Sequence, residues 1–169
     1  MLPEQLKNHP AAVALDASLP EAITGGHAEH GEPTLFISPA SIVDVCRYLK
    51  DQQKFVRLSA VTAVDWHPAD PRFEVVYLLH SLEDNSRLRL KCWVSESECE
   101  IDSVNGVWRA ANWYEREIFD LFGIRFRNHP DLRRILMPTD WVGHPLRKDY
   151  PVHGYKYSYQ HDMDPTCES

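Results

Sequence analysis

The sequence predicts an α+β fold: a two-layer domain with a mostly antiparallel sheet and flanking helices, followed by a short helix and an extended, irregular C-terminal tail. Two observations predict the domain. Apolar residues recur at helical spacing in residues 39–50, and three strand-like segments follow one another in residues 57–94. A third observation predicts the tail, because five prolines beyond Gly123 leave no room for a long regular element.

The length of 169 residues fits one domain with an appendage, and 43% hydrophobic residues are enough for a core. We divide the chain into an α+β body (1–102), a helical connector (103–123) and an extended tail (124–169). The last part contains Tyr155-Lys-Tyr-Ser-Tyr159, which could add as a strand to a partner, or the terminus could be disordered or folded on its own domain.

The body begins with weak signals. Residues 4–17 indicate a short helix that Pro10 interrupts. The polar residues 19–32 indicate a weak strand or a loop, and residues 34–37 indicate a short strand. A stronger helix is predicted from residue 38 to about residue 50, with proline at the first helical position. Its buried face is expected to carry Ile42, Val45, Cys46 and Leu49.

Three strands are predicted next, at residues 57–66, 72–80 and 87–94, with a proline-rich turn at 67–71. In the third strand, apolar and polar residues alternate. One face carries Leu88, Leu90, Cys92 and Val94, and the other carries Arg87, Arg89, Lys91 and Trp93. This alternation indicates an antiparallel meander with one buried and one exposed face.

A helix is predicted from Trp113 to Phe122, and Gly123 is well placed to end it. Asn112 has the position of an N-cap, and Glu115 stands three residues later, which is the spacing of a capping box. The polar face is predicted to carry Trp113, Arg116, Glu117 and Asp120, with Arg116 paired to Asp120. The other interpretation of Glu115 is a partly buried carboxylate that pairs with an arginine of the tail or of a partner.

Charge is distributed unevenly. Residues 125–150 contain six Arg or Lys and three Asp, a net charge of +3, so the rest of a chain of net charge −7 carries −10. The overall charge argues against a general nucleic-acid binder. A basic ribbon without regular periodicity indicates contact with another surface, either an acidic partner or the acidic body of this chain.

Several function classes find no support. The four cysteines form no C-x-x-C pair, which argues against an iron–sulfur or structural zinc site, and Cys46 and Cys92 are expected to be small buried hydrophobes. The chain has no nucleotide-binding loop, no G-x-S-x-G and no signal-peptide pattern. No run of about 18 apolar residues predicts a membrane span, and a reducing compartment fits the cysteine usage. A metal enzyme remains an alternative through the histidines of the tail, His129, His144, His153 and His161.

The segment from Glu115 to Pro151 contains Glu115-Arg-Glu, Asp120-Leu-Phe-Gly, His129-Pro, Arg133 and Ile135-Leu-Met-Pro138. These residues closely resemble the hallmark of a known family, the "30 kDa" subunit, or C subunit, of respiratory complex I, the proton-pumping NADH:quinone oxidoreductase. The match continues through Asp140-Trp-Val-Gly-His-Pro-Leu-Arg-Lys-Asp-Tyr-Pro151. The motif residues are Glu115, Arg116, Glu117, Asp120, Leu121, Phe122, Gly123, His129, Pro130, Arg133, Ile135 and Leu136.

The resemblance implies a non-redox structural subunit of the peripheral arm, on the cytoplasmic face of the bacterial inner membrane. Such a subunit has no catalytic residue, cofactor or metal of its own, whereas its parent complex uses FMN, iron–sulfur clusters, NADH and quinone. The tail is implied to wrap around the D subunit of the complex, its large quinone-site subunit, beside other peripheral-arm subunits. No nucleic acid is expected to bind, and membrane contact is expected only through the complex.

The residues expected at the partner interface combine cations and large side chains: Arg133, Arg134, Trp141, Leu146, Arg147, Lys148 and Tyr150. We expect the cations to pair with carboxylates of the partner or of the body, and Trp141 and Leu146 to fill apolar pockets. Truncation after Gly123 should leave a body that no longer assembles. The alternatives are the equivalent small subunit of a membrane-bound [NiFe] hydrogenase or of a ferredoxin- or F420H2-linked dehydrogenase, and an adaptor of some other complex.

Overall fold

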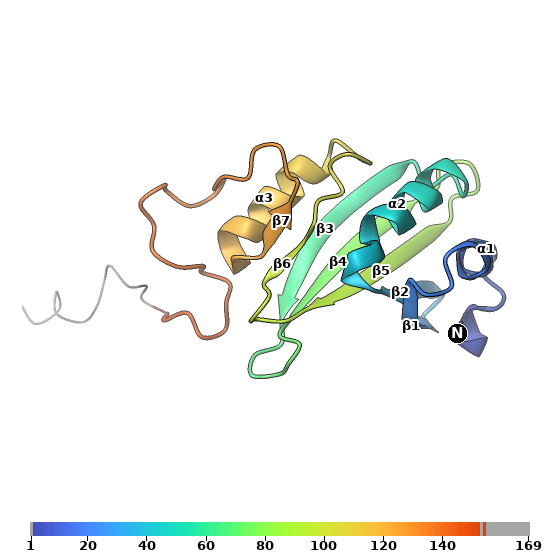
Figure 1. Ribbon diagram of the computed structural model, residues 1–169, viewed down its shortest axis with the longest axis horizontal. Helices are drawn as coiled ribbons and strands as arrows, with labels where there is room; N and C mark the ends of the chain where they lie inside the picture. The colour runs from blue at the N-terminus through green and yellow to red at the C-terminus, as the bar shows by residue number, and fades with distance from the viewer. Residues whose placement is uncertain (1, 153, 155–169) are drawn as a thin grey trace, which may run out of the picture.

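The computed structural model describes residues 2–152 and residue 154. Predictions for Tyr155–Tyr159, His153 and His161 therefore lie outside the described residues. Within them, no helix combines the length and apolar character needed to cross a membrane. The predicted fold class is confirmed: a five-stranded, mostly antiparallel sheet packs against helices and is followed by a short helix and an irregular segment (Figure 1).

The N-terminal region differs from the prediction at Pro10. A short 3₁₀ helix, η1 (Glu4–Leu6), precedes α1 (Pro10–Ser18), so Pro10 begins the helix and does not interrupt it. Proline suits that position because the first N–H groups of a helix have no partner within it. The weak segment that follows is a strand, β1 (Ile23–Glu29), paired with β2 (Glu32–Ile37).

The helix predicted after residue 38 is present. A 3₁₀ turn, η2 (Pro39–Ser41), leads into α2 (Ile42–Asp51). Its predicted inner face is confirmed, because Ile42, Val45, Cys46 and Leu49 are all buried. Burial of these side chains in one row fixes which face of α2 lies on the sheet.

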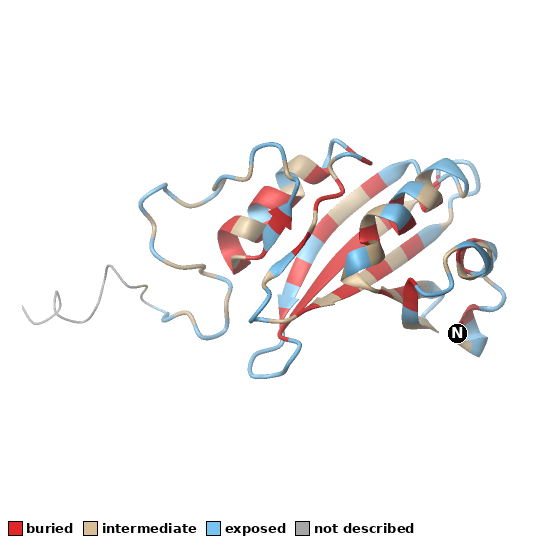
Figure 2. Ribbon diagram, in the orientation of Figure 1, coloured by how far each residue is buried: buried red, intermediate tan, exposed pale blue. Residues whose placement is uncertain are grey.

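The sheet has the strand order β1-β2-β5-β4-β3, with β3 (Arg57–Asp65), β4 (Phe73–His80) and β5 (Arg87–Val94). All neighbours are antiparallel except β2 and β5, which are parallel. The predicted alternation of β5 is confirmed, and its even-numbered residues from 88 to 94 are buried (Figure 2). They join one hydrophobic core with the inner faces of α2 and α3.

A small second sheet connects the body to the tail. Strand β6 (Glu100–Asp102) pairs in parallel with β7 (Arg125–Arg127), and α3 (Ala111–Phe122) connects the two. Arg127 reinforces the pairing with two hydrogen bonds of 3.0 Å to the Asp102 carboxylate. The division at residues 102 and 123 stays a prediction, but β7 shows that the first residues of the tail are bonded to the last strand of the body.

Candidate functional site

The candidate site is the ribbon, residues 124–150, together with the surfaces of the body on which it lies. Figure 1 shows this segment leaving α3 and running past the end of the sheet without forming a further helix. Several buried or partly buried polar groups hold it to the body, and we call three of them anchors. They are the carboxylate of Asp120, the C-terminal carbonyls of α3, and the guanidinium of Arg72.

The first anchor is Asp120, which is fully buried on α3. Its Oδ2 accepts hydrogen bonds from the backbone N–H groups of Ile135, Leu136 and Met137, at 3.0, 2.7 and 2.8 Å. Its Oδ1 accepts one of 2.7 Å from Arg134 Nη1. Burial alone would raise the pKa of Asp120, but these four donors outweigh it and hold the pKa below its ordinary value. The ribbon therefore bends around a carboxylate that stays charged.

The predicted pair between Arg116 and Asp120 is wrong. Arg116 is buried and donates to the carbonyls of Arg133 and Arg134, at 3.1 and 3.3 Å. The i,i+4 spacing would allow the pair on an exposed helix face, but this face of α3 is covered by the ribbon. Both side chains therefore bond to the ribbon and not to each other.

The second anchor is the C-terminus of α3, whose last carbonyls have no partner within the helix. His144 Nδ1 donates to Asp120 O at 2.9 Å, Leu146 N–H to Leu121 O at 3.0 Å, and Arg147 Nε to Phe122 O at 2.6 Å. Gly123 ends the helix in the left-handed region, with a φ of 78°, as its position predicts. The ribbon thus satisfies the carbonyls that the helix leaves open.

Replacing Gly123 with alanine is expected to lower the free energy of unfolding by more than the cost of backbone strain alone. A Cβ there would lie 2.6 Å from the His144 ring and 2.9 Å from Arg147 Nη2, so the second anchor would have to move. Gly31 is a matched control, because its φ is 79° and nothing lies within 4 Å of a Cβ built there. We expect a loss of about 1 kcal/mol for Gly31→Ala and about 3 kcal/mol for Gly123→Ala, measured by urea unfolding. Equal losses would contradict the anchor.

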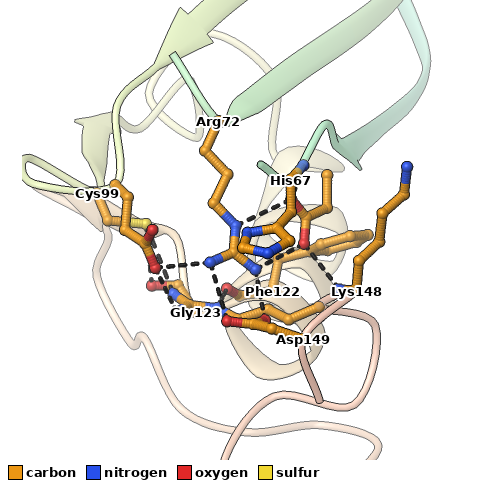
Figure 3. A network of polar contacts seen from close by, with 10 residues as sticks. His67, Arg72, Cys99, Phe122, Gly123, Lys148 and Asp149 are labelled. Carbon is orange, nitrogen blue, oxygen red and sulfur yellow. Dashed lines mark hydrogen bonds and ion pairs between the residues drawn. The ribbon is translucent and has the colours of Figure 1, made fainter. Parts of the chain in front are cut away.

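The third anchor is Arg72, which precedes β4 and is 2% exposed. It donates two hydrogen bonds to Asp65, of 2.9 and 2.8 Å, and two to Asp149 of the ribbon, of 2.5 and 3.1 Å (Figure 3). Glu96 accepts another, of 2.7 Å. Asp65 also accepts from the backbone N–H of Lys148 at 2.8 Å. Residues 148 and 149 are therefore fixed to a buried ion network of the body.

The charges of this network hold one another in the ionised form. Burial would raise the pKa of Asp65, but the bonds from Arg72, Lys148 and His67 lower it well below its ordinary value. The bond from Arg72 likewise lowers the pKa of Asp149. Arg72 and Arg147 also lie against the ring of Phe73, with their guanidinium carbons 5.0 and 5.1 Å from its centre.

The sequence prediction did not include the members of this network: Asp65, Arg72, Glu96 and Asp149. The separation of these residues in the sequence does not indicate that the ends of the strands contact the ribbon. The one available signal was the net charge of −10 outside the ribbon, which indicated carboxylates for its cations but not which ones.

The predicted capping box of Glu115 is wrong. The helix begins two residues earlier than expected, and Ala110 at its N-cap makes no side-chain bond. Glu115 is instead fully buried and accepts from Ser103 Oγ at 2.5 Å and Val104 N–H at 2.8 Å. The alternative of a buried carboxylate is correct, but the basic group that faces it is His129, with Nε2 at 3.9 Å, and not an arginine.

Burial raises the pKa of Glu115 from 4.5 to about 7, although the bonds from Ser103 and Val104 act in the opposite direction. A raised folded-state pKa means that the contribution to stability is complete below about pH 4.5 and is lost as the pH rises to about 7. We expect this loss to be about 3 kcal/mol and to be absent in Glu115→Gln. Glu117→Gln, on the exposed side of the same helix, is the control.

The measurement is urea unfolding at pH 5, 6, 7 and 8 for the parent chain and both variants. Burial lowers the pKa values of His129 and His144, and these groups oppose Glu115 in the lower part of the range. The difference between the parent chain and Glu115→Gln removes their contribution. If that difference does not change with pH, Glu115 does not titrate as its burial requires.

The side chains of the ribbon, which include predicted site residues and also Val142, divide between two sides. The inner side holds the anchors Arg134 and Arg147, which are partly buried, and the outer side exposes apolar side chains. Leu136, Val142 and Leu146 are 56%, 53% and 51% exposed.

The remaining predicted interface residues are Arg133, Trp141, Lys148 and Tyr150. Arg133 is exposed and pairs with Asp131 at 2.9 Å. Tyr150 donates to Val142 O at 3.0 Å, and Trp141 is half-buried. Lys148 is exposed, and its Nζ lies 6.0 Å from the centre of the Trp66 ring.

Of the predicted cation pairs, Arg134 with Asp120 and Arg147 with Glu96 lie within the chain, the latter at 3.7 Å. Across the part of the chain that the structure describes, no group of three or more histidine, cysteine or carboxylate side chains is arranged to hold a metal ion. That finding covers His129 and His144, and the other two histidines of the metal alternative lie outside it.

Fold and ribbon together define a small α+β protein whose extended C-terminal segment is bonded to its own body. The family model for the 30 kDa subunit of respiratory-chain NADH dehydrogenase matches residues 35–156. The chain belongs to this family.

The names of similar proteins agree with this family. The chain is 48% identical over 151 residues to the NADH-quinone oxidoreductase C subunit of Geotalea uraniireducens, in an alignment that covers 89% of this chain and 92% of the relative. It is 44% identical over 161 residues to the corresponding protein of Roseiflexus sp., with coverage of 94% and 92%.

Two solved structures share the fold of this chain. The trypsin-resistant fragment (1-134) of Nqo5 superposes with a TM-score of 0.63 at 28% identity, covering 71% of this chain and 97% of the fragment. A chain of the membrane-bound sulfane sulfur reductase, an archaeal respiratory membrane complex, gives a TM-score of 0.68 at 23% identity, covering 93% of each chain. At that identity the second match shows the shared fold alone.

Proposed function

We propose that this chain is a non-redox structural subunit of the peripheral arm of a proton-pumping NADH:quinone oxidoreductase, and that its ribbon clamps the large quinone-site subunit. The curated relatives named as C subunits of NADH-quinone oxidoreductase favour this complex over a hydrogenase or a ferredoxin-linked enzyme. FMN and iron–sulfur clusters would belong to other subunits. The chain would lie on the cytoplasmic face of the membrane.

One observation carries the proposal: the ribbon has two different sides. Arg134, His144 and Arg147 turn inward and bond to α3, whereas Leu136, Val142 and Leu146 are exposed. Exposed apolar side chains such as these are available for contact with a partner, and apolar contacts contribute to the core of protein interfaces. A segment that is already ordered also loses less conformational entropy on binding than a free chain would. The ribbon is therefore suited to hold a partner in a fixed position.

Replacing Leu136 and Leu146 with aspartate together is expected to remove the large quinone-site subunit from the complex that a tagged chain isolates from solubilised membranes. Both side chains are about half exposed, so the melting temperature of the isolated chain should change by less than about 2 °C. Burial of an unpaired charge at the interface should lower the recovery of the large quinone-site subunit at least about tenfold.

The matched control carries Val13→Asp and Leu82→Asp, which are 43% and 61% exposed on other parts of the body. This control should recover the large quinone-site subunit at the level of the parent chain. Normal recovery with the ribbon variant would overturn the proposed clamp, and equal losses with both variants would show an effect of surface charge alone.

A further inference from the structure

Besides the ribbon, the face of the main sheet opposite α2 is a second surface suited to binding. We call it the open face. The register places three residues of this face directly opposite one another across three strands: Arg57 on β3, His80 on β4 and Arg87 on β5. Arg89 lies two residues further along β5, opposite Leu78. Adjacent strands are about 4.8 Å apart, so the row brings basic groups close together.

This row lacks the carboxylates that would neutralise it. Arg89 pairs with Glu32 on β2. Among the described residues, no carboxylate lies within ion-pair distance of Arg57 or Arg87, and His80 contacts the Asn85 amide at 2.8 Å. An accumulation of positive charge on a chain of net charge −7 therefore points to an anionic ligand.

The shape of the open face indicates what kind of anion fits. The basic row borders a pocket of about 330 Å³, which is also lined by Pro33, Leu78 and Leu88. At the other end of the same strands, Trp66, Trp93 and Pro71 line an apolar hollow of about 380 Å³. The two indole rings there lie 6.3 Å apart.

Strand β5 contributes residues to both pockets. Trp93 lies six positions after Arg87, which corresponds to about 20 Å in a strand. Between them, Lys91 is already neutralised by Glu74, at 2.8 Å. A small anion would reach only the basic pocket, whereas an extended peptide of about seven residues would reach both. The occupant that matches charge and length is therefore a segment of another protein.

We propose that the open face binds an extended acidic segment of a neighbouring subunit, with carboxylates on Arg57 and Arg87 and an apolar side chain in the hollow lined by Trp66 and Trp93. This surface lies on the main sheet and does not include Leu136, Val142 or Leu146, although Lys148 of the ribbon approaches its Trp66 ring to 6.0 Å. The proposal therefore goes beyond the clamp on the large quinone-site subunit and can fail independently of it.

The test uses the intact complex, isolated through a tag on this chain. A photo-crosslinking residue replaces Thr62, which is exposed on the open face opposite Val76, and a control crosslinker replaces Asp44 on the exposed side of α2. In parallel, Arg57→Glu/Arg87→Glu is compared with Lys7→Glu/Arg47→Glu, which changes the charge equally at exposed helical sites. Recovery of each subunit is measured against salt concentration, and melting temperatures verify folding.

We expect the Thr62 position, and not the Asp44 position, to crosslink a peptide of another subunit that contains at least two carboxylates. Recovery of that subunit should fall about tenfold with Arg57→Glu/Arg87→Glu, and should return when its carboxylates are exchanged for lysine. The large quinone-site subunit should stay bound in every arm, because the ribbon is unchanged.

Three results would overturn the proposal of an acidic segment. One is recovery of every subunit that is unaffected by Arg57→Glu/Arg87→Glu. Another is the absence of a crosslink from Thr62. The third is a rise in the melting temperature of the parent chain with inorganic phosphate that does not occur in the Arg57→Glu/Arg87→Glu variant. This result would show a small-anion site.

Discussion

Replacing Arg72 with methionine is expected to lower the free energy of unfolding by about 3–5 kcal/mol. Methionine retains most of the packing volume but leaves Asp65, whose side chain is 2% exposed, without its cation. It also removes both hydrogen bonds to Asp149, so the end of the ribbon should detach from the body. Urea unfolding measures the first effect, and limited proteolysis after residue 140 measures the second.

Two further variants separate the contributions of the network. Asp149→Asn removes only the carboxylate of the ribbon, which is 44% exposed, and should cost about 1 kcal/mol. Adding Asp65→Asn to Arg72→Met should recover part of the loss, since it removes the unpaired buried charge. A cost below about 1 kcal/mol for Arg72→Met would show that the network does not hold the ribbon.

Replacing Asp120 with alanine is expected to have the second large effect, a loss of about 3–4 kcal/mol. Three backbone N–H groups and Arg134 lose their shared acceptor at once. Asp120→Asn retains an acceptor oxygen but not the charge, and should cost about half as much. Glu117→Ala, on the exposed side of the same helix, should leave the free energy of unfolding within about 0.5 kcal/mol of the parent chain. Urea unfolding of all three variants tests this order, and equal losses for Asp120→Ala and Glu117→Ala would contradict it.

The main sheet could be predicted because its residues carry local signals. Burial on one face of β5 follows from simple alternation, and the buried row of α2 follows from helical spacing. The parallel pairing of β6 with β7 could not be predicted, because strands of three residues have no measurable period. The role of Pro10 was predicted wrongly, because a proline that begins a helix cannot be distinguished from one that interrupts it when the helix start is not known.

The candidate site was predicted only in outline. Its location in residues 115–150 came from composition and from the family resemblance, but the partners of Glu115, Arg116 and Asp120 did not. Sequence spacing shows which residues share a helix face and not what covers that face. Here the ribbon covers α3, and polar groups that an exposed helix would turn to solvent are buried.

This arrangement also changes how a truncation should be interpreted. A chain cut after Gly123 would lose the partners of Asp120 and of the last carbonyls of α3, in addition to any contact with the large quinone-site subunit. Failure to assemble would then reflect an unfolded helix as much as a missing clamp. Substitutions on the outer side, such as those at Leu136 and Leu146, avoid this ambiguity.

The ribbon is bonded to its own body before any partner binds. Hydrogen exchange of the amides of Ile135, Leu136 and Met137 in the isolated full-length chain tests it most directly, because these three N–H groups bond to Asp120. We expect exchange at least about 100-fold slower than in an unstructured peptide, and loss of this protection in Asp120→Ala. Exchange at the unstructured rate in the isolated chain, with protection only in the assembled complex, would contradict it.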